Sequence, residues 1–234
     1  MDFLALQTRT IERIGEPSTP IYWTLAEVKE ALNKATRFFA LLTLCVERSA
    51  SFSLSANTAF YTPQTQLTDF LKPLRVTTSA GARLLPYTLD QLNKESDSWR
   101  TTTGTPAKYA QQGYDLLAVT PVPAGAGVTL TVRYAASPAT LTANGDEPEI
   151  PEEQRDCLID YAIYWLRAKE GGQEFVKTLP KLGQFLDVAG KYADFVRAKS
   201  KAQLYDAMPL DLQGFDRSRL LKLVLASQKG AMKK

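Results

Sequence analysis

The chain has 234 residues, of which 44% are hydrophobic, 10% aromatic and 23% charged, a composition typical of water-soluble globular proteins. This length suffices for one domain with a sizeable core or for two small domains. Lysine and arginine number 28 against 25 aspartates and glutamates, so the net charge of +3 does not indicate a dedicated nucleic-acid-binding protein. Histidine is absent, which excludes Ser-His-Asp and Cys-His catalysis and argues against a catalytic zinc site.

The two cysteines do not indicate a disulfide framework. Cys45 and Cys157 lie far apart in apolar stretches, and we expect both to be buried free thiols. Residues 1–6 lack the basic and long apolar regions of a signal peptide. The longest apolar stretch, residues 38–46, is interrupted by Thr43 and is shorter than the roughly 20 residues that span a bilayer. We therefore expect a protein of an aqueous compartment that does not contact a membrane.

Residues 1–48 are expected to form two helices, the first ending near Gly15. Thr24, followed three residues later by Glu27, is the pattern of a capping box and predicts the start of the second helix. Apolar residues then recur at helical spacing and cover more than half of the circumference. Such a helix has to be covered on two sides, either by its own fold or by a neighbouring subunit.

Between residues 49 and 140 the apolar period becomes two, which predicts a small antiparallel β module. Two alternating runs, 115–121 and 128–134, flank a glycine-rich turn and predict a hairpin. Pro121 and Pro123 lack backbone N–H donors and should end the first of these strands. A short helical turn is expected after Thr88, which would cap it.

The helical period returns in residues 141–205. A helix is expected to open at Pro151 and to end at 171–172, because prolines favour helix starts and glycines helix ends. A further helix is expected beyond Pro180. The sequence therefore predicts an α+β fold, in which a helical bundle formed by the N- and C-terminal helices carries the inserted β module and an extended C-terminal arm. The expected parts are 1–48 and 141–205 for the bundle, 49–140 for the β module and 206–234 for the arm.

No motif has the spacing of a catalytic, cofactor or metal site. The acidic cluster over 146–156 could supply oxygen ligands to calcium or magnesium, but it lacks the EF-hand spacing. Helix capping and solvation explain it better. The glycines at 183 and 190 are separated by six residues instead of the four of a P-loop, which favours helix packing. We therefore expect no enzyme, no cofactor and no metal.

A segment around Trp99, Gly104, Pro106 and Tyr109 stands out from the rest. Taken alone, it indicates a restricted Gly-x-Pro turn whose aromatic anchors pack on a sheet. With residues further along the chain, it resembles the head-to-tail adaptor (connector) proteins of tailed bacteriophages, over roughly residues 20–200. The residues that carry the resemblance are Trp99, Gly104, Pro106, Tyr109, Gly113, Pro121, Pro123, Tyr134, Pro151 and Tyr161.

The resemblance implies a structural virion protein in the neck, between the capsid portal and the tail. Proteins of this family form a ring, usually of twelve copies, under the portal. The ring extends the channel for genomic DNA without sequence-specific binding, and it gives tail or nozzle proteins a docking surface. The implied location is the virion neck, and the host cytoplasm during assembly.

The last stretch, residues 209–234, is both apolar and basic, which is unusual for a frayed terminus. Docking on its own domain and docking on a partner both explain this pattern. The resemblance implies that a C-terminal arm grips the portal. The residues that we expect to dock are Leu210, Leu212, Phe215, Arg217, Arg219, Leu220, Leu221, Leu223 and Leu225.

Other functions stay open on the sequence. One is a tail-completion, stopper or other tail-side ring protein, although the predicted helices argue against a β-rich tail tube. Another is DNA binding through the basic C-terminal segment. A hydrolase is disfavoured by the absence of histidine and of a catalytic motif.

Overall fold

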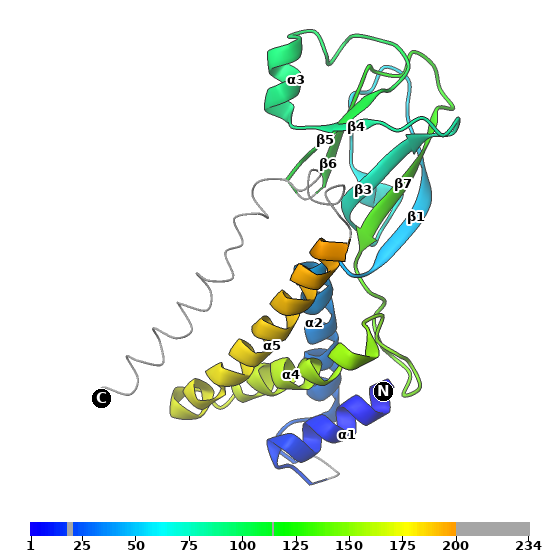
Figure 1. The fold of residues 1–234 in the computed structure, drawn as a ribbon. Coiled ribbons are helices and arrows are strands. Elements are labelled where there is room, and N and C mark those ends of the chain that lie inside the picture. Colours follow the sequence, from blue (N-terminus) through cyan, green and yellow to red (C-terminus); the bar gives the residue numbers. More distant parts are fainter. Residues whose placement is uncertain (18–20, 114, 200–234) are drawn as a thin grey trace. The chain divides into compact units, whose positions relative to one another are not determined.

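A computed structural model describes residues 1–17, 21–113 and 115–199 of the chain (Figure 1). These residues divide into two units. The first unit, residues 1–45 and 138–198, is helical, and the second, residues 46–137, contains two β-sheets. The α+β class predicted from the sequence is confirmed.

Four helices of the first unit contribute to one apolar core. They are α1 (Phe3–Ile14), α2 (Leu25–Thr43), α4 (Asp156–Arg167) and α5 (Gly172–Lys199), and a 3₁₀ turn, η2 (Glu152–Gln154), precedes α4. Helix α2 packs against both α1 and α4. Its residues Val28, Leu32 and Phe39 are fully buried, so the wide apolar face of this helix is covered mainly within its own unit.

The predicted helix starts at Thr24 and Thr88 are confirmed. At α2, the Thr24 hydroxyl accepts a hydrogen bond from the Glu27 N–H at 3.2 Å, and the Glu27 carboxylate accepts one from the Thr24 N–H at 2.8 Å. The same reciprocal pair opens α3 (Leu89–Glu95), where Gln91 takes the place of the glutamate. Such boxes satisfy amide donors that the first helical turn leaves unpaired.

The second unit consists of one three-stranded and one four-stranded sheet. The first sheet has the order β1-β7-β3 and is antiparallel throughout. The second sheet has the order β2-β6-β5-β4. The strands are β1 (Glu47–Ser53), β2 (Phe60–Tyr61), β3 (Phe70–Thr78), β4 (Leu85–Tyr87), β5 (Lys108–Gln112), β6 (Leu116–Thr120) and β7 (Thr129–Ala136), with a 3₁₀ turn η1 (Pro63–Thr65) after β2.

Two predicted details of the β unit are wrong. Strands β6 and β7 do not form a hairpin, because β6 pairs with β5 and β7 belongs to the other sheet. Pro121 and Pro123 end β6, and the residues up to 128 give the chain room to change sheets. The module is also not wholly antiparallel, since β4 and β5 run parallel. Their connection, residues 88–107, contains α3 and is long enough for the crossover that a parallel pair requires.

The C-terminal helices also differ from the prediction. Helix α4 begins at Asp156, five residues after Pro151, and ends before the glycines at 171–172. Helix α5 begins at Gly172 and runs through Pro180, so the expected start beyond this proline is wrong. An interior proline costs a helix about 3 kcal/mol. Burial of the following apolar residues, Phe185 among them, offsets this cost.

Candidate functional site

Trp99 anchors the loop after α3 on the four-stranded sheet. Only 4% of this residue is exposed, and its ring meets the Phe60 ring edge-on, with 5.5 Å between centroids. The indole N–H donates a hydrogen bond to the Asn93 Oδ1 atom at 2.8 Å. The Thr120 hydroxyl donates to the Trp99 carbonyl oxygen at 3.2 Å. The tryptophan thereby ties α3, the loop and strand β6 together.

Gly104 passes close to the chain that leaves β6. Its N–H donates to the Val122 carbonyl oxygen at 2.8 Å. A Cβ atom at this position would lie 3.2 Å from the Pro121 Cβ, so a larger residue would push the two segments apart. Pro106 is buried, and the following amide donates to the Thr120 carbonyl oxygen at 3.0 Å. The structure therefore brings Trp99, Gly104, Pro106 and Pro121 together around the end of β6.

Two buried tyrosines of the family-like set serve as anchors in different sheets. Tyr109 lies in β5, and burial raises the pKa of its phenol to about 12. Tyr134 lies in β7 and donates its hydroxyl to the Asp69 Oδ1 atom at 2.9 Å. Burial, together with the neighbouring Asp69 carboxylate, raises the pKa of Tyr134 to about 12 as well. Both phenols are therefore neutral packing groups at physiological pH.

The remaining family-like residues do not converge on one place. Gly113 has φ +60° at the end of β5, and Pro123 is buried after β6. Pro151 and Tyr161 belong to the helical unit, where the Tyr161 ring lies 5.0 Å from the Phe185 ring. The ten residues therefore support packing and turns in both units, and they do not build a binding cleft.

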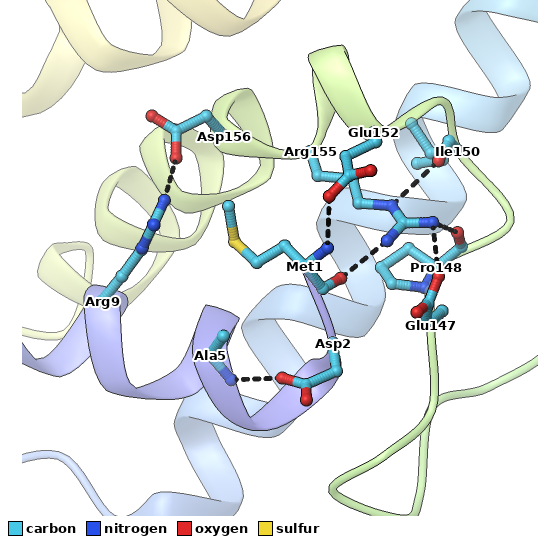
Figure 2. A network of polar contacts seen from close by, with 10 residues as sticks. All are labelled: Met1, Asp2, Ala5, Arg9, Glu147, Pro148, Ile150, Glu152, Arg155 and Asp156. Atoms are coloured by element: carbon cyan, nitrogen blue, oxygen red, sulfur yellow. Dashed lines mark hydrogen bonds and ion pairs between the residues drawn. The ribbon is translucent and has the colours of Figure 1, made fainter.

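A polar group of the helical unit with several buried partners is Arg155, which sequence reasoning missed (Figure 2). Its buried guanidinium donates to three carbonyl oxygens, those of Met1 at 2.8 Å, Ile150 at 3.0 Å and Pro148 at 3.2 Å. It also pairs with the Glu147 carboxylate at 3.0 Å. Arg155 therefore connects the start of α4 with Met1 and with the segment 147–150.

The free amides at the start of α1 are satisfied by this same region. The Phe3 N–H donates to the Asp146 carbonyl oxygen at 2.8 Å. The Ala5 N–H donates to the Asp2 carboxylate at 2.8 Å (Figure 2). Because the first N–H groups of a helix have no partner within it, these bonds fix where α1 begins. The segment around residue 146 thus acts as a cap for a helix more than a hundred positions away.

The acidic cluster is engaged in caps and ion pairs. The N–H groups of Thr142 and Ala143 donate to the Asp146 carboxylate and lower its pKa. Arg13, 2.8 Å from Asp156, is the main cause that lowers the pKa of that carboxyl. In the parts of the chain that the structure describes, no three acidic or cysteine side chains lie together as a metal site would need.

A shallow pocket of the helical unit is rich in basic side chains, but their charges are balanced. Arg13, Arg167, Lys177 and Lys181 line it, beside Ile163, Glu174 and Thr178. Each basic side chain pairs with an acid: Arg13 with Asp156, Arg167 with Glu170, Lys177 with Glu174 and Lys181 with Asp160. The pocket therefore offers no surplus of charge to hold an anionic ligand.

The comparison with protein families decides the class of this protein. Residues 1–212 match the model of the SU10 adaptor protein family, whose members are phage head-to-tail adaptors. The chain belongs to this family. No curated protein matches the chain significantly. Membership confirms the resemblance drawn from the sequence, and it indicates a structural adaptor of the virion neck that contacts portal and tail proteins.

No pattern in the sequence indicates that the side chain of Arg155 is buried in this adaptor. It lies within the acidic cluster, where an arginine is expected to be a solvated partner of the acids. Its acceptors are mainly backbone carbonyls, which no side-chain pattern records. Arg155 directly precedes α4, and a charged residue at the start of a helix is usually exposed, so its position did not indicate burial either.

Other expectations for the adaptor concern thiols, membranes and the arm. Cys45 and Cys157 are both free, but only Cys157 is buried, while Cys45 is half-buried. Burial raises the pKa of Cys157 to about 12.

No helix among the described residues is long and apolar enough to cross a bilayer. The portal-docking candidates between Leu210 and Leu225 lie outside the described residues.

Proposed function

We propose that this adaptor forms a ring beneath the portal, extends the DNA channel and gives the tail its docking surface. The observation that carries the proposal is the family match over residues 1–212. Twelve is the copy number that the resemblance implies. In this proposal the parts 1–48, 49–140 and 141–205 form the body of the ring, and 206–234 form an arm.

Exposed apolar side chains of the helical unit support a repeated contact between copies. Ile21 is 86% exposed, Leu25 is 45% exposed and Leu41 is also exposed, although the core of the unit is closely packed. A ring buries one patch of each copy against a different patch of the next, through heterologous contacts. The small net charge of +3 also suits a channel wall along which DNA slides, because strong neutralisation of phosphates would retain the DNA.

The segment from residue 209 onward is proposed to grip the portal, with its leucines as the apolar contact and Arg217 and Arg219 as polar partners. Deletion of 209–234 should abolish binding to the portal protein of the same phage while the thermal unfolding temperature stays unchanged. Deletion of 229–234 alone is the matched control, because it removes the basic end and leaves all nine candidates in place.

Portal binding is measured best by co-sedimentation of each purified variant with portal rings. Loss of binding in the longer deletion, and retention in the shorter one, supports the assignment. Binding that survives the longer deletion contradicts it. If the intact chain binds tail proteins but never the portal, the protein is a tail-side ring component instead.

A further inference from the structure

The three-stranded sheet β1-β7-β3 has one face whose central rows are polar and exposed or half-buried. The register places Arg133 of β7 between Ser49 of β1 and Arg75 of β3. The rows beside this one consist of short hydroxyl residues, which are Ser51, Ser53, Thr77, Thr129 and Thr131. We call these three rows the hydroxyl face. They contain no aromatic or aliphatic side chain.

Three exposed arginines lie close together on the hydroxyl face. Arg75 and Arg133 are directly opposite each other, and the Cβ atoms of such pairs are about 5 Å apart. Arg83 joins the next row, because its antiparallel bridge sets it opposite Thr77. Like charges directly opposite each other destabilise a sheet, so this arrangement does not serve the stability of the fold.

Only one of the three positive charges is compensated. The Glu47 carboxylate accepts a hydrogen bond from the Arg133 Nε atom at 2.8 Å. In the part of the chain that the structure describes, no carboxylate pairs with Arg75 or Arg83. The charge of Arg83 acts on the phenol of Tyr109, which is neutral at physiological pH. Three positive charges against one negative charge leave a surplus of two on this face.

The chemistry of the hydroxyl face fits the phosphate backbone of a nucleic acid. Arginine, serine and threonine side chains are common donors to phosphate oxygens, and the guanidinium group matches phosphate geometry. A protein partner fits less well, because the centre of a protein interface is rich in aromatic and other apolar side chains. Single strands fit less well too, since they stack their bases on aromatic rings. The face therefore favours the backbone of a duplex.

The surplus of two charges also sets the strength of such a contact. Each cation that neutralises a phosphate adds to affinity and makes it dependent on salt. Two unpaired arginines neutralise few phosphates, so one copy holds a duplex weakly. Contacts to phosphates carry no sequence information, so the DNA can slide along the face.

We propose that the hydroxyl face contacts the phosphate backbone of double-stranded DNA, with Arg75 and Arg83 as the main cations. The inference rests on the proposed function for the identity of the DNA, which is the genome passing through the ring. Arg133 lies beside these two residues and remains partly neutralised by Glu47.

The test measures binding of the purified full-length protein to a labelled DNA duplex by fluorescence anisotropy at several salt concentrations. The Arg75→Ala/Arg83→Ala variant removes both unpaired charges. Lys94→Ala/Arg100→Ala is the matched control, because it removes the same charge from exposed residues of the same unit that lie outside this sheet.

We expect the wild-type protein and the control to bind duplexes of unrelated sequence equally well. The Arg75→Ala/Arg83→Ala variant should bind at least about tenfold more weakly at low salt. Its slope of log affinity against log salt concentration should be shallower by about 1.8, since each phosphate contact contributes about 0.9. Its unfolding temperature should not fall, because the substitution removes a pair of like charges.

Several results overturn the inference. One is the absence of duplex binding by the wild-type protein at low salt, and another is an equal salt slope in the variant and the control. Tighter binding of polyglutamate than of the duplex assigns the face to an acidic protein instead. If the variant misfolds, the wild-type slope still decides, because a slope near zero contradicts phosphate contacts.

Co-sedimentation with portal rings separates this inference from the proposed function. A wild-type protein that joins the portal but does not bind the duplex overturns only the role of the hydroxyl face. A protein that binds the duplex through Arg75 and Arg83 but never joins the portal overturns the proposed function and leaves the DNA contact in place.

Discussion

The guanidinium of Arg155 donates a hydrogen bond to the carbonyl oxygen of Met1 at 2.8 Å, across 154 positions of the chain. The same side chain holds the carbonyl oxygens of Pro148 and Ile150. One buried cation therefore joins Met1, the segment that contains Pro148 and Ile150, and the start of α4. Its loss would leave several buried carbonyl groups without a donor.

Arg155→Ala should lower the free energy of unfolding by about 2–4 kcal/mol, because a buried acceptor left unpaired costs about 1–3 kcal/mol. Urea unfolding followed by far-UV circular dichroism measures the change. Arg9→Ala is the control, since Arg9 forms an exposed ion pair with Asp156 at 3.2 Å and such pairs contribute less than about 1 kcal/mol. Equal effects of the two substitutions would contradict the role assigned to Arg155.

The two buried tyrosines predict a loss of stability at alkaline pH. A tyrosine ordinarily has a pKa near 10, whereas the pKa values of Tyr109 and Tyr134 in the folded protein are about 12. The unfolded chain therefore releases these protons first, and the free energy of unfolding falls as the pH rises from about 10 to 12. Tyr134→Phe should make this fall shallower, as measured by urea unfolding at several pH values. A fall as steep as that of wild type would contradict the prediction.

Two glycines of the turn between β6 and β7 provide a matched pair of backbone tests. Gly127 has φ +86°, and Gly125 lies outside the left-handed region, while a Cβ atom at either position would meet nothing within 4 Å. Gly127→Ala should therefore destabilise the protein by about 1 kcal/mol through backbone strain alone. Gly125→Ala should be neutral or slightly stabilising. The thermal unfolding temperatures of both variants check the difference. A lower unfolding temperature for Gly125→Ala than for Gly127→Ala would contradict the conformation of this turn.

Helix α2 allows a similar comparison of buried and exposed leucines. Leu32 is fully buried in the helical core, whereas Leu25, at the start of the same helix, is 45% exposed. Leu32→Ala should cost about 2–5 kcal/mol of unfolding free energy, because it removes buried surface and leaves a cavity. Leu25→Ala should cost less than about 1 kcal/mol in the isolated chain. Similar losses in chemical denaturation would mean that the face of α2 is assigned wrongly.

Features that depend on neighbouring residues could be predicted from the sequence. The capping box at Thr24 and the helix cap at Thr88 are predicted because they depend on residues within one helical turn. The end of α1 near Gly15 is predicted because glycine favours helix ends, and Gly15 adopts a φ of +87° there. The family-like residues Trp99 and Gly104 were recognised by their order. Their partners, Asn93 and Val122, appear only in the structure.

Features that depend on distant pairing were missed. Strands β6 and β7 have the alternation of a hairpin, but alternation does not specify the partner strand. Strand β6 pairs with β5, and β7 pairs with β1. The sequence predicts a helix boundary at Pro180, yet Pro180 lies inside α5, because burial of Phe185 downstream outweighs the local cost of the proline. Arg155 was overlooked for the same reason, because its acceptors lie on a terminus and a loop that only the fold brings together.

The central proposal is that this adaptor assembles as a ring on the portal, and its native mass tests this most directly. The full-length protein, 25.9 kDa per chain, is measured by native mass spectrometry alone and mixed with the portal protein of the same phage. We predict a complex with one adaptor per portal subunit, and a chain that is small when alone would show that the portal templates the ring. The absence of any such complex at every salt concentration would contradict the account.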